Sequence, residues 1–297
     1  MTLPREILPG QRFLITRRCT QRQFLLRPSR LTNQIIEYSL ALAAEHTGVT
    51  IHAACFMSNH WHGVVTDPEA RLPEFLERFH RLVAKAQNAS LGRWENLWSS
   101  DKTSAVLLVD DADVLEKMAY TISNPVTAGL VRSPFEWPGV ISLRFAAPRA
   151  VEMPDVFFDD EGELDDDATL QFTRPDVGLS DAAFDARLND LIADRVRRAR
   201  MDMLIRGLPF VGRNTVLRQP FFGTPRTPAP RRNANPRIAA KRTRARIDAI
   251  RRMLKFQRDY RDARLRWRDG DRDVVFPAGT YLLRVHSRVA CSSAVPP

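Results

Sequence analysis

Two histidines separated by a single residue, His60 and His62, have a spacing that could hold a metal ion. Side chains alternate between the two faces of a β-strand, so both imidazoles would point the same way and Trp61 would point to the opposite face. Two imidazoles on one face can chelate one divalent cation. Two ordinary surface or core histidines would give the same spacing, and this pattern alone leaves both interpretations open.

A second pair of residues that could take part in a reaction, Tyr120 and Asn124, lies four positions apart in the segment KMAYTISNPVTAGLV. Residues four apart share one face of a helix, so a phenol and a carboxamide would be presented together. We expect the helix to end before Pro125, because the residue preceding a proline disfavours helical geometry. Taken alone, Tyr120 is also explained as a core tyrosine of an amphipathic helix.

The elements that must position these residues follow from hydrophobic periodicity. Alternation predicts four strands, one within residues 11–26 and the others at 51–57, 60–66 and 104–109, with a turn at Ser58-Asn59 between the second and third. Helical spacing predicts three helices, which begin after Ser29, at Pro73 and near Asp111. The order β-α-β-β-α-β-α indicates an α+β fold, an antiparallel-sheet sandwich with helices.

The two motifs, in this order, resemble those of the single-tyrosine HUH transposases, and in particular the REP-associated tyrosine transposases. The matching segments are FMSNHWHGVVTDP at 56–68, WENLW at 94–98 and YTISNPVTAGLV at 120–131, followed by Pro134 and Trp137-Pro138. The resemblance covers about residues 8–145. It implies an HUH endonuclease-like fold and a transposase-like DNA strand transferase that cleaves single-stranded DNA through a 5′-phosphotyrosine intermediate.

The resemblance also implies a role for each residue of the motifs. His60 and His62 would bind Mg²⁺ or Mn²⁺, and Asn124 would supply a third ligand. Tyr120 would be the nucleophile, assisted by the metal because a phenol is a poor nucleophile at neutral pH. Magnesium prefers oxygen ligands, whereas manganese tolerates imidazole better. The implied partner is single-stranded DNA beside a hairpin, and the protein could be a monomer or a homodimer.

Further residues are candidates for DNA contact. Arginines could bind phosphates and an exposed tryptophan could stack on a base. These candidates are Arg17, Arg18, Arg22, Trp94, Arg242 and Arg244. Core packing is the alternative for the tryptophans, and we favour it for Trp61. We expect His80 on the polar face of its helix.

The overall composition fits a nucleic-acid partner. The chain has 45 Lys and Arg against 35 Asp and Glu, a net charge of +10, and such a surplus is typical of proteins that bind polyanions. Its three cysteines lie far apart, so neither a disulfide framework nor a thiolate zinc site is expected. The chain lacks an apolar run of about 18 residues, which predicts a cytoplasmic protein with no membrane partner.

Composition divides the chain into three expected regions. Residues 1–148 would form the catalytic domain, 149–179 an acidic linker and 180–297 a basic helical region. Nine acidic residues and no basic one lie between Glu152 and Asp167; a linker, a solvated face or a mimic of nucleic acid would each explain them.

The basic region also has predicted elements. We expect an amphipathic helix at 180–206, an extended segment at 219–236, a basic helix at 237–268 and a strand pair around Pro277-Ala278-Gly279. From Arg226 to Arg272 there are 17 Lys or Arg and 5 Asp, a balance of 17 − 5 = +12. Such a segment could contact DNA or RNA, or could simply be solvated.

Three hypotheses for function remain at the level of sequence. The first is the strand transferase described above, an enzyme. The second is a catalytically silent regulator, derived from a transposase, that only recognises a DNA structure. The third is a metal-dependent ribonuclease or RNA-binding protein with a similar α+β fold. A covalent protein–DNA adduct that disappears in Tyr120→Phe would separate the first from the other two.

Overall fold

The computed structural model describes residues 4–157, 162, 164–227 and 236–293. The first half of the chain follows the predicted order β-α-β-β-α-β-α, with a 3-10 turn after the first strand. These elements are β1 (Gln11–Arg18), η1 (Thr20–Arg22), α1 (Arg30–Thr47), β2 (Thr50–Met57), β3 (His60–Asp67), α2 (Leu72–Ser90), β4 (Ser104–Leu108) and α3 (Asp111–Thr127).

The second half contains shorter strands and long helices. It comprises η2 (Pro134–Glu136), β5 (Arg149–Glu152), β6 (Asp167–Leu170), α4 (Asp181–Ile205), α5 (Arg213–Leu217), β7 (Ile238–Ala239), α6 (Thr243–Arg268) and α7 (Leu282–Ser287).

A five-stranded sheet in the order β2-β3-β1-β4-β7 forms the centre of the fold. The pairs β2–β3, β3–β1 and β1–β4 are antiparallel, as predicted, whereas β7 joins β4 in parallel. The molecule therefore has an α+β fold with a mixed sheet. The parallel edge strand was not predicted because two residues are too few to show a periodicity.

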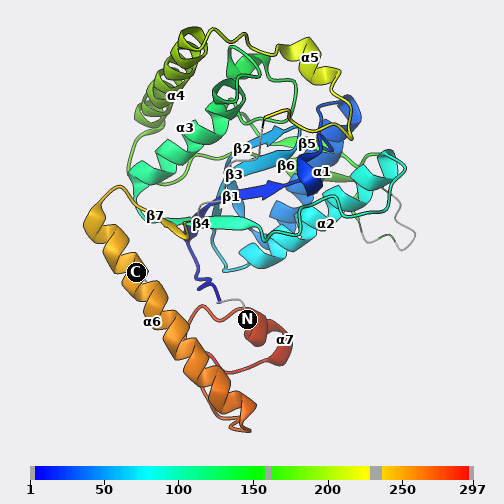
Figure 1. The fold of residues 1–297 in the computed structure, drawn as a ribbon. Helices are drawn as coiled ribbons and strands as arrows, with labels where there is room; N and C mark the ends of the chain where they lie inside the picture. Colours follow the sequence, from blue (N-terminus) through cyan, green and yellow to red (C-terminus); the bar gives the residue numbers. More distant parts are fainter. Residues whose placement is uncertain (1–3, 158–161, 163, 228–235, 294–297) are drawn as a thin grey trace.

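Helices cover both faces of this sheet (Figure 1). Alternation along β1 sends Phe13 into the core with α1 and α2, and sends Leu14 into the core with α3 and α4. Along β3, Trp61 joins the α1–α2 side and Val64 the α3 side. Because His60 and His62 have the same parity as Val64, they lie on the face covered by α3.

The start of α1 agrees with the predicted signal, and a glycine defines its end. The Ser29 side chain accepts a hydrogen bond from the Thr32 backbone N–H, and Gly48 ends the helix in the left-handed conformation at φ 70°. The end of α3 differs from the prediction, because the helix passes through Pro125 and stops at Thr127. Pro125 removes a single N–H, and the bond from Ala128 N–H to the Asn124 carbonyl, 2.9 Å long, continues the helical pattern beyond it.

The acidic stretch expected as a linker contains ordered structure. Strands β5 and β6 pair in an antiparallel hairpin that lies against α1. Val151, Ala168 and Leu170 of this hairpin belong to the same buried cluster as the α1 side chains. The region expected as a linker thus contains two paired strands, while residues 158–161 and 163 of the stretch lie outside the described residues.

Helix α4 also belongs to the main core. Phe184 and Leu188 pack with the residues of α3, so segments from both sides of the expected boundary near 148 share one buried cluster. The predicted helix at 180–206 is confirmed as Asp181–Ile205. It buries one apolar stripe against α3 and leaves its other side in solvent.

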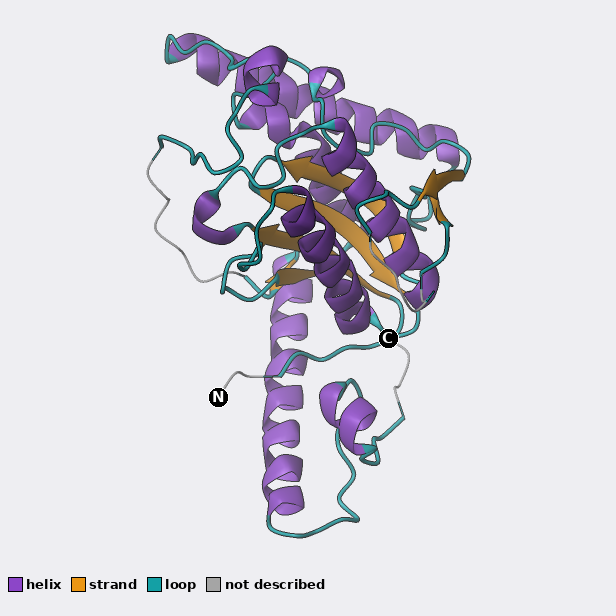
Figure 2. Ribbon diagram, turned by 90° about the vertical axis from the view of Figure 1, so that its right-hand side faces the viewer, coloured by secondary structure: helices purple, strands orange, loops and turns teal. Residues whose placement is uncertain are grey.

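The basic helix differs from its predicted bounds. It begins at Thr243, and residues 238–239 form β7 instead. Of the extended segment expected at 219–236, residues 228–235 lie outside the described residues. Figures 1 and 2 show α6 projecting from the β7 edge of the sheet. The strand pair predicted around Pro277 was wrong: residues 282–287 form α7, and Phe276 makes a single parallel bridge with Cys291.

All three cysteines are free. Within the described parts of the chain, no helix combines the length and the apolarity that crossing a membrane requires.

Candidate active site

The sheet and α3 bring the two sequence motifs together. The rings of His60 and His62 have centroids 4.9 Å apart, and the ring of Tyr120 lies 5.2 Å from that of His62, edge to face at 74°. The two histidines come from the start of β3, where the tight turn at Ser58-Asn59 places them at the end of the hairpin. Residues that lie far apart in the sequence therefore form one cluster.

His62 is fixed from the neighbouring strand. Thr16 is its register partner on β1, and the Thr16 Oγ1 lies 2.8 Å from the His62 Nδ1. Burial holds the pKa of His62 well below its ordinary value, and the nearby His60 and Arg18 lower it further. His62 is therefore neutral at physiological pH, with Nδ1 engaged and Nε2 as the remaining ring nitrogen.

His60 has a similar arrangement. Its Nδ1 lies 2.7 Å from the side-chain oxygen of Asn59, which only accepts, so Nδ1 carries the proton and Nε2 is left with a lone pair. Burial lowers the pKa of His60 to about 4, and the positive charges of Arg18 and Arg22 act in the same direction. Neutral imidazoles with a free Nε2 are the form in which histidine binds metals.

Tyr120 and Asn124 share a face of α3, as their spacing predicted. Burial raises the pKa of the Tyr120 hydroxyl, whereas a hydrogen bond with the Asn124 side chain and the charges of Arg195 and Arg18 oppose that shift. Asn124 is buried and Tyr120 is partly exposed. The phenol is therefore protonated at rest, next to groups that favour its anion.

A residue that the sequence did not reveal, Arg195 of α4, also reaches the site. Its guanidinium carbon lies 5.9 Å from the centre of the Tyr120 ring. Glu116 forms a 2.8 Å ion pair with this guanidinium and a second ion pair, 2.9 Å long, with the Lys241 ammonium. Lys117, in the turn before Tyr120, places its ammonium 6.0 Å from the same ring. The apolar spacing of α4 gave no signal for this contact, which depends on how α4 crosses α3.

The residues present fit a metal ion that accepts nitrogen ligands. Two neutral imidazoles lie side by side, and both have their Nδ1 atoms occupied by fixed partners. Across the described residues, no group of three or more His, Cys, Asp and Glu side chains gathers as a metal site. Two imidazoles as ligands suit Mn²⁺ better than Mg²⁺.

The predicted DNA-contact residues fall into two groups. Arg18 is exposed at the end of β1, opposite His60 in the sheet register, and Arg22 acts electrostatically on the same histidine. Arg17 lies on the other face, where it donates to Thr103 Oγ1 at 2.6 Å and stacks on Trp98. Trp94 is 91% exposed and open to contact.

The two candidates from the basic helix lie elsewhere. Arg242 pairs with the buried carboxylate of Asp110 and so supports the start of α3. Asp110 follows Leu108, which pairs with Arg12, whereas His60 pairs with Arg18. About six residues of strand separate these positions, roughly 20 Å at about 3.3 Å per residue. Arg244 is exposed near the same end, so neither arginine joins the cluster around Tyr120.

Behind the site, Trp61 is a core residue, as predicted, but His80 is not on a polar face. Trp61 is 1% exposed and donates from Nε1 to His80 Nε2 at 3.2 Å. His80 is buried and packs edge-on against Trp98. The helical periodicity did not predict the burial of His80, because a histidine can either face water or accept a hydrogen bond from a buried tryptophan N–H.

Comparisons with known proteins give little beyond these observations. No family model matches the sequence, and no curated protein matches it significantly. A similar solved structure is that of a REP-associated tyrosine transposase bound to a REP hairpin, with 19% sequence identity and a TM-score of 0.38. The similarity covers 48% of this chain and 82% of that chain. A TM-score this low supports no inference about function.

Proposed function

We propose that this protein is a metal-assisted DNA strand transferase of the transposase kind, which cleaves single-stranded DNA through a 5′-phosphotyrosine intermediate. The observation that carries the proposal is the placement of the Tyr120 ring 5.2 Å from His62 and, through it, beside His60. Two motifs that resemble the paired motifs of tyrosine transposases are thus adjacent in space.

The proposed reaction is a transfer of a phosphoryl group to the phenol. The Tyr120 oxygen loses its proton to solvent and attacks the scissile phosphorus, while the bond from phosphorus to the 3′ oxygen breaks. The leaving 3′ oxygen takes up a proton and becomes a free 3′-OH. Attack of a 3′-OH on the phosphotyrosine reverses these steps and joins strands without ATP, because the new ester retains the energy of the broken bond.

The chain's own groups support each part of this proposal. His60, His62 and Asn124 would hold Mn²⁺ or Mg²⁺, which when bound polarises the phosphate. Arg195 and Arg18, whose charges lower the pKa of Tyr120, would favour both the phenolate and the negative charge of the transition state. Glu116 keeps Arg195 in place by its 2.8 Å ion pair.

The proposed substrate is single-stranded DNA next to a hairpin, as the sequence resemblance implies. Arg18 and Arg22 provide cations near His60, and Trp94 provides an exposed indole. Such groups suit phosphate contact and base stacking. In this proposal, residues 1–148 supply the reacting groups. The contact between α4 and α3 adds Arg195, so the region from 180 onward contributes to the same unit.

A cleavage and rejoining assay tests the proposal. The full chain is incubated with Mn²⁺ and a labelled DNA strand that carries a hairpin beside a single-stranded segment. We expect a shortened strand with a 3′-OH that a polymerase extends, and no such product from Tyr120→Phe. Tyr260→Phe, which removes a hydroxyl from α6, is the matched control and should cleave like the wild type. Binding of this DNA without any cleavage would instead support the silent regulator.

A further inference from the structure

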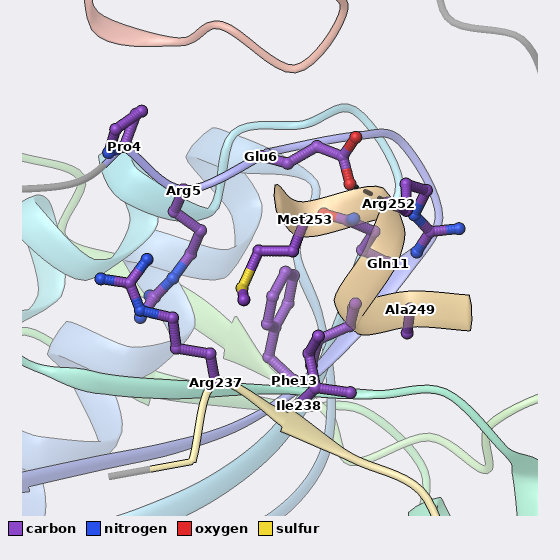
Figure 3. Close-up of a pocket in the computed structure, with 11 residues that line it drawn as sticks. Pro4, Arg5, Glu6, Gln11, Phe13, Arg237, Ile238, Ala249, Arg252 and Met253 are labelled. Atoms are coloured by element: carbon purple, nitrogen blue, oxygen red, sulfur yellow. Dashed lines mark ion pairs between the residues drawn. The ribbon is translucent and has the colours of Figure 1, made fainter. Parts of the chain in front are cut away.

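A small cavity on the other side of the sheet, at the edge where β7 joins, contains an unusual pair of arginines. The cavity lies between the N-terminal segment, β1, β7 and α6, and its floor includes the apolar side chains Phe13, Ile238 and Met253. Arg5 and Arg237 also line the cavity. Figure 3 shows their guanidinium ends converging, while Glu6 turns toward Arg252 on the far side.

The charges around this cavity do not balance. Its lining includes three arginines and one glutamate, a net charge of 3 − 1 = +2. The single carboxylate, Glu6, pairs with Arg252 at 3.4 Å, so it does not neutralise the other two arginines. Burial lowers the pKa of Arg5, and the charge of Arg237 lowers it further. Two like charges held close together repel, and an anion bound between them would relieve that repulsion.

The backbone fixes both arginines in this position. The segment after Arg5 is held by the bond from Ile7 N–H to the Gly279 carbonyl at 3.1 Å. The Arg237 carbonyl accepts from the Leu107 N–H at 2.9 Å, which extends the β4–β7 pairing. Because these two backbone segments are anchored, binding of a ligand would not have to order them first.

We infer that Arg5 and Arg237 form a phosphate-binding site for a nucleic-acid backbone, separate from the candidate active site. Paired guanidinium groups match the oxygens of a phosphate, and they bind it by charge-assisted hydrogen bonds. A nucleic acid is favoured over a free anion because the surrounding sequence is strongly basic, with a balance of +12 from Arg226 to Arg272.

The location makes this a second binding place rather than part of the first. Gln11 and Phe13 line the cavity, whereas Arg18 pairs with His60 at the opposite end of β1. About five to seven residues of strand separate the two places, roughly 17–23 Å. Phe13 also faces the α1–α2 side, away from the face of His60. A nucleic acid bound here would anchor the protein without touching Tyr120.

The test measures binding of the full chain to a labelled single-stranded DNA of mixed sequence in EDTA, at several salt concentrations. Because no chemistry occurs in EDTA, failure here leaves the proposal for Tyr120 untouched. We expect Arg5→Gln/Arg237→Gln to bind about tenfold more weakly, and the slope of log affinity against log salt to fall by about 0.7 for each phosphate that the variant no longer neutralises. Arg187→Gln/Arg213→Gln removes two exposed arginines of α4 and α5 and is the charge-matched control.

Two further measurements make the test decisive. Arg5→Lys/Arg237→Lys should recover part of the affinity, which a fold defect would not allow, and equal melting temperatures confirm intact folding. Affinity of the glutamine pair within about twofold of the control pair would overturn the inference. The inference would also be overturned if inorganic phosphate raised the melting temperature of the wild type but not of the glutamine pair, while both proteins bound DNA equally well. The site would then hold a free anion.

Discussion

The Thr16 hydroxyl lies 2.8 Å from the Nδ1 of His62, across the β1–β3 pairing. This hydrogen bond orients the imidazole that lies next to Tyr120. It engages Nδ1, so Nε2 is the ring nitrogen that could bind a metal. It joins the central strand of the sheet to the candidate metal ligand. Groups that orient a ligating histidine commonly change metal affinity by about 10- to 100-fold when removed.

Replacing Thr16 by valine should therefore weaken metal binding without removing a ligand. We expect Thr16→Val to raise the Kd for Mn²⁺ by about tenfold or more, because His62 loses its orienting bond. Titration calorimetry of the full chain with Mn²⁺ measures this directly. Thr169→Val, on the exposed face of β6, is the matched control and should bind Mn²⁺ like the wild type. Equal affinities for both variants would show that Thr16 does not position a ligand.

The two histidines themselves should have a larger effect. We expect His60→Ala and His62→Ala each to abolish detectable Mn²⁺ binding, because the site offers two imidazoles and no gathered carboxylates among the residues that the structure describes. The same titration provides the measurement. His286→Ala, on α7, should bind as the wild type does. Unchanged binding by either site variant would place the metal elsewhere.

Arg195 should affect the reaction although it lies outside both sequence motifs. We expect Arg195→Ala to slow DNA cleavage by about 10- to 100-fold, as removal of a group that stabilises transition-state charge commonly does. Single-turnover cleavage rates at saturating DNA give this value. Arg195→Lys should recover part of the rate. Arg197→Ala, an exposed neighbour on α4, should react at the wild-type rate, and equal rates for both alanine variants would exclude the proposed role.

A buried histidine away from the site, His52, predicts how stability depends on pH. Its ring lies 2.8 Å from the Thr173 carbonyl and 2.7 Å from Thr66 Oγ1, and burial lowers its pKa to about 4. An unfolded histidine titrates near pH ~6.5. Between about pH 6.5 and about pH 4, His52 therefore binds a proton in the unfolded chain but not in the folded chain, and stability falls as pH falls.

Substitution of His52 tests this sign. The contribution of His52 to the free energy of unfolding falls by about 2 kcal/mol from about pH 7.5 to about pH 5. Over this interval the free energy of unfolding of His52→Gln should therefore fall by about 2 kcal/mol less than that of the wild type. Urea unfolding at both pH values measures it. His286→Gln should retain the wild-type dependence. An identical decrease in His52→Gln and the wild type would mean that His52 is not held neutral by the fold.

Short-range patterns predicted much of the site. The period of two placed His60 and His62 on one face and Trp61 in the core, and the spacing of four placed Tyr120 beside Asn124. The turn at Ser58-Asn59 was also evident, but its role in orienting His60 was not. Each of these features depends on backbone periodicity or on residues adjacent in sequence.

Features that depend on tertiary packing could not be predicted in this way. Arg195 reaches Tyr120 only because α4 crosses α3, and Thr16 meets His62 only through strand register. The strands β5 and β6 flank a stretch dominated by acidic residues, and each is only four residues long, too short to show a clear period of two. Arg242 resembled a free cation in sequence, yet it neutralises Asp110 in the fold.

The identity of the residue that links to DNA is the most direct test of the proposed function. The full chain is incubated with Mn²⁺ and hairpin-flanked single-stranded DNA, denatured and digested, and the DNA-linked peptide is sequenced by mass spectrometry. We expect a phosphodiester-derived link on Tyr120, which is absent in EDTA and in Tyr120→Phe and present in Tyr260→Phe. A link on another residue, or an adduct that persists in Tyr120→Phe, would contradict the assignment of Tyr120 as the nucleophile.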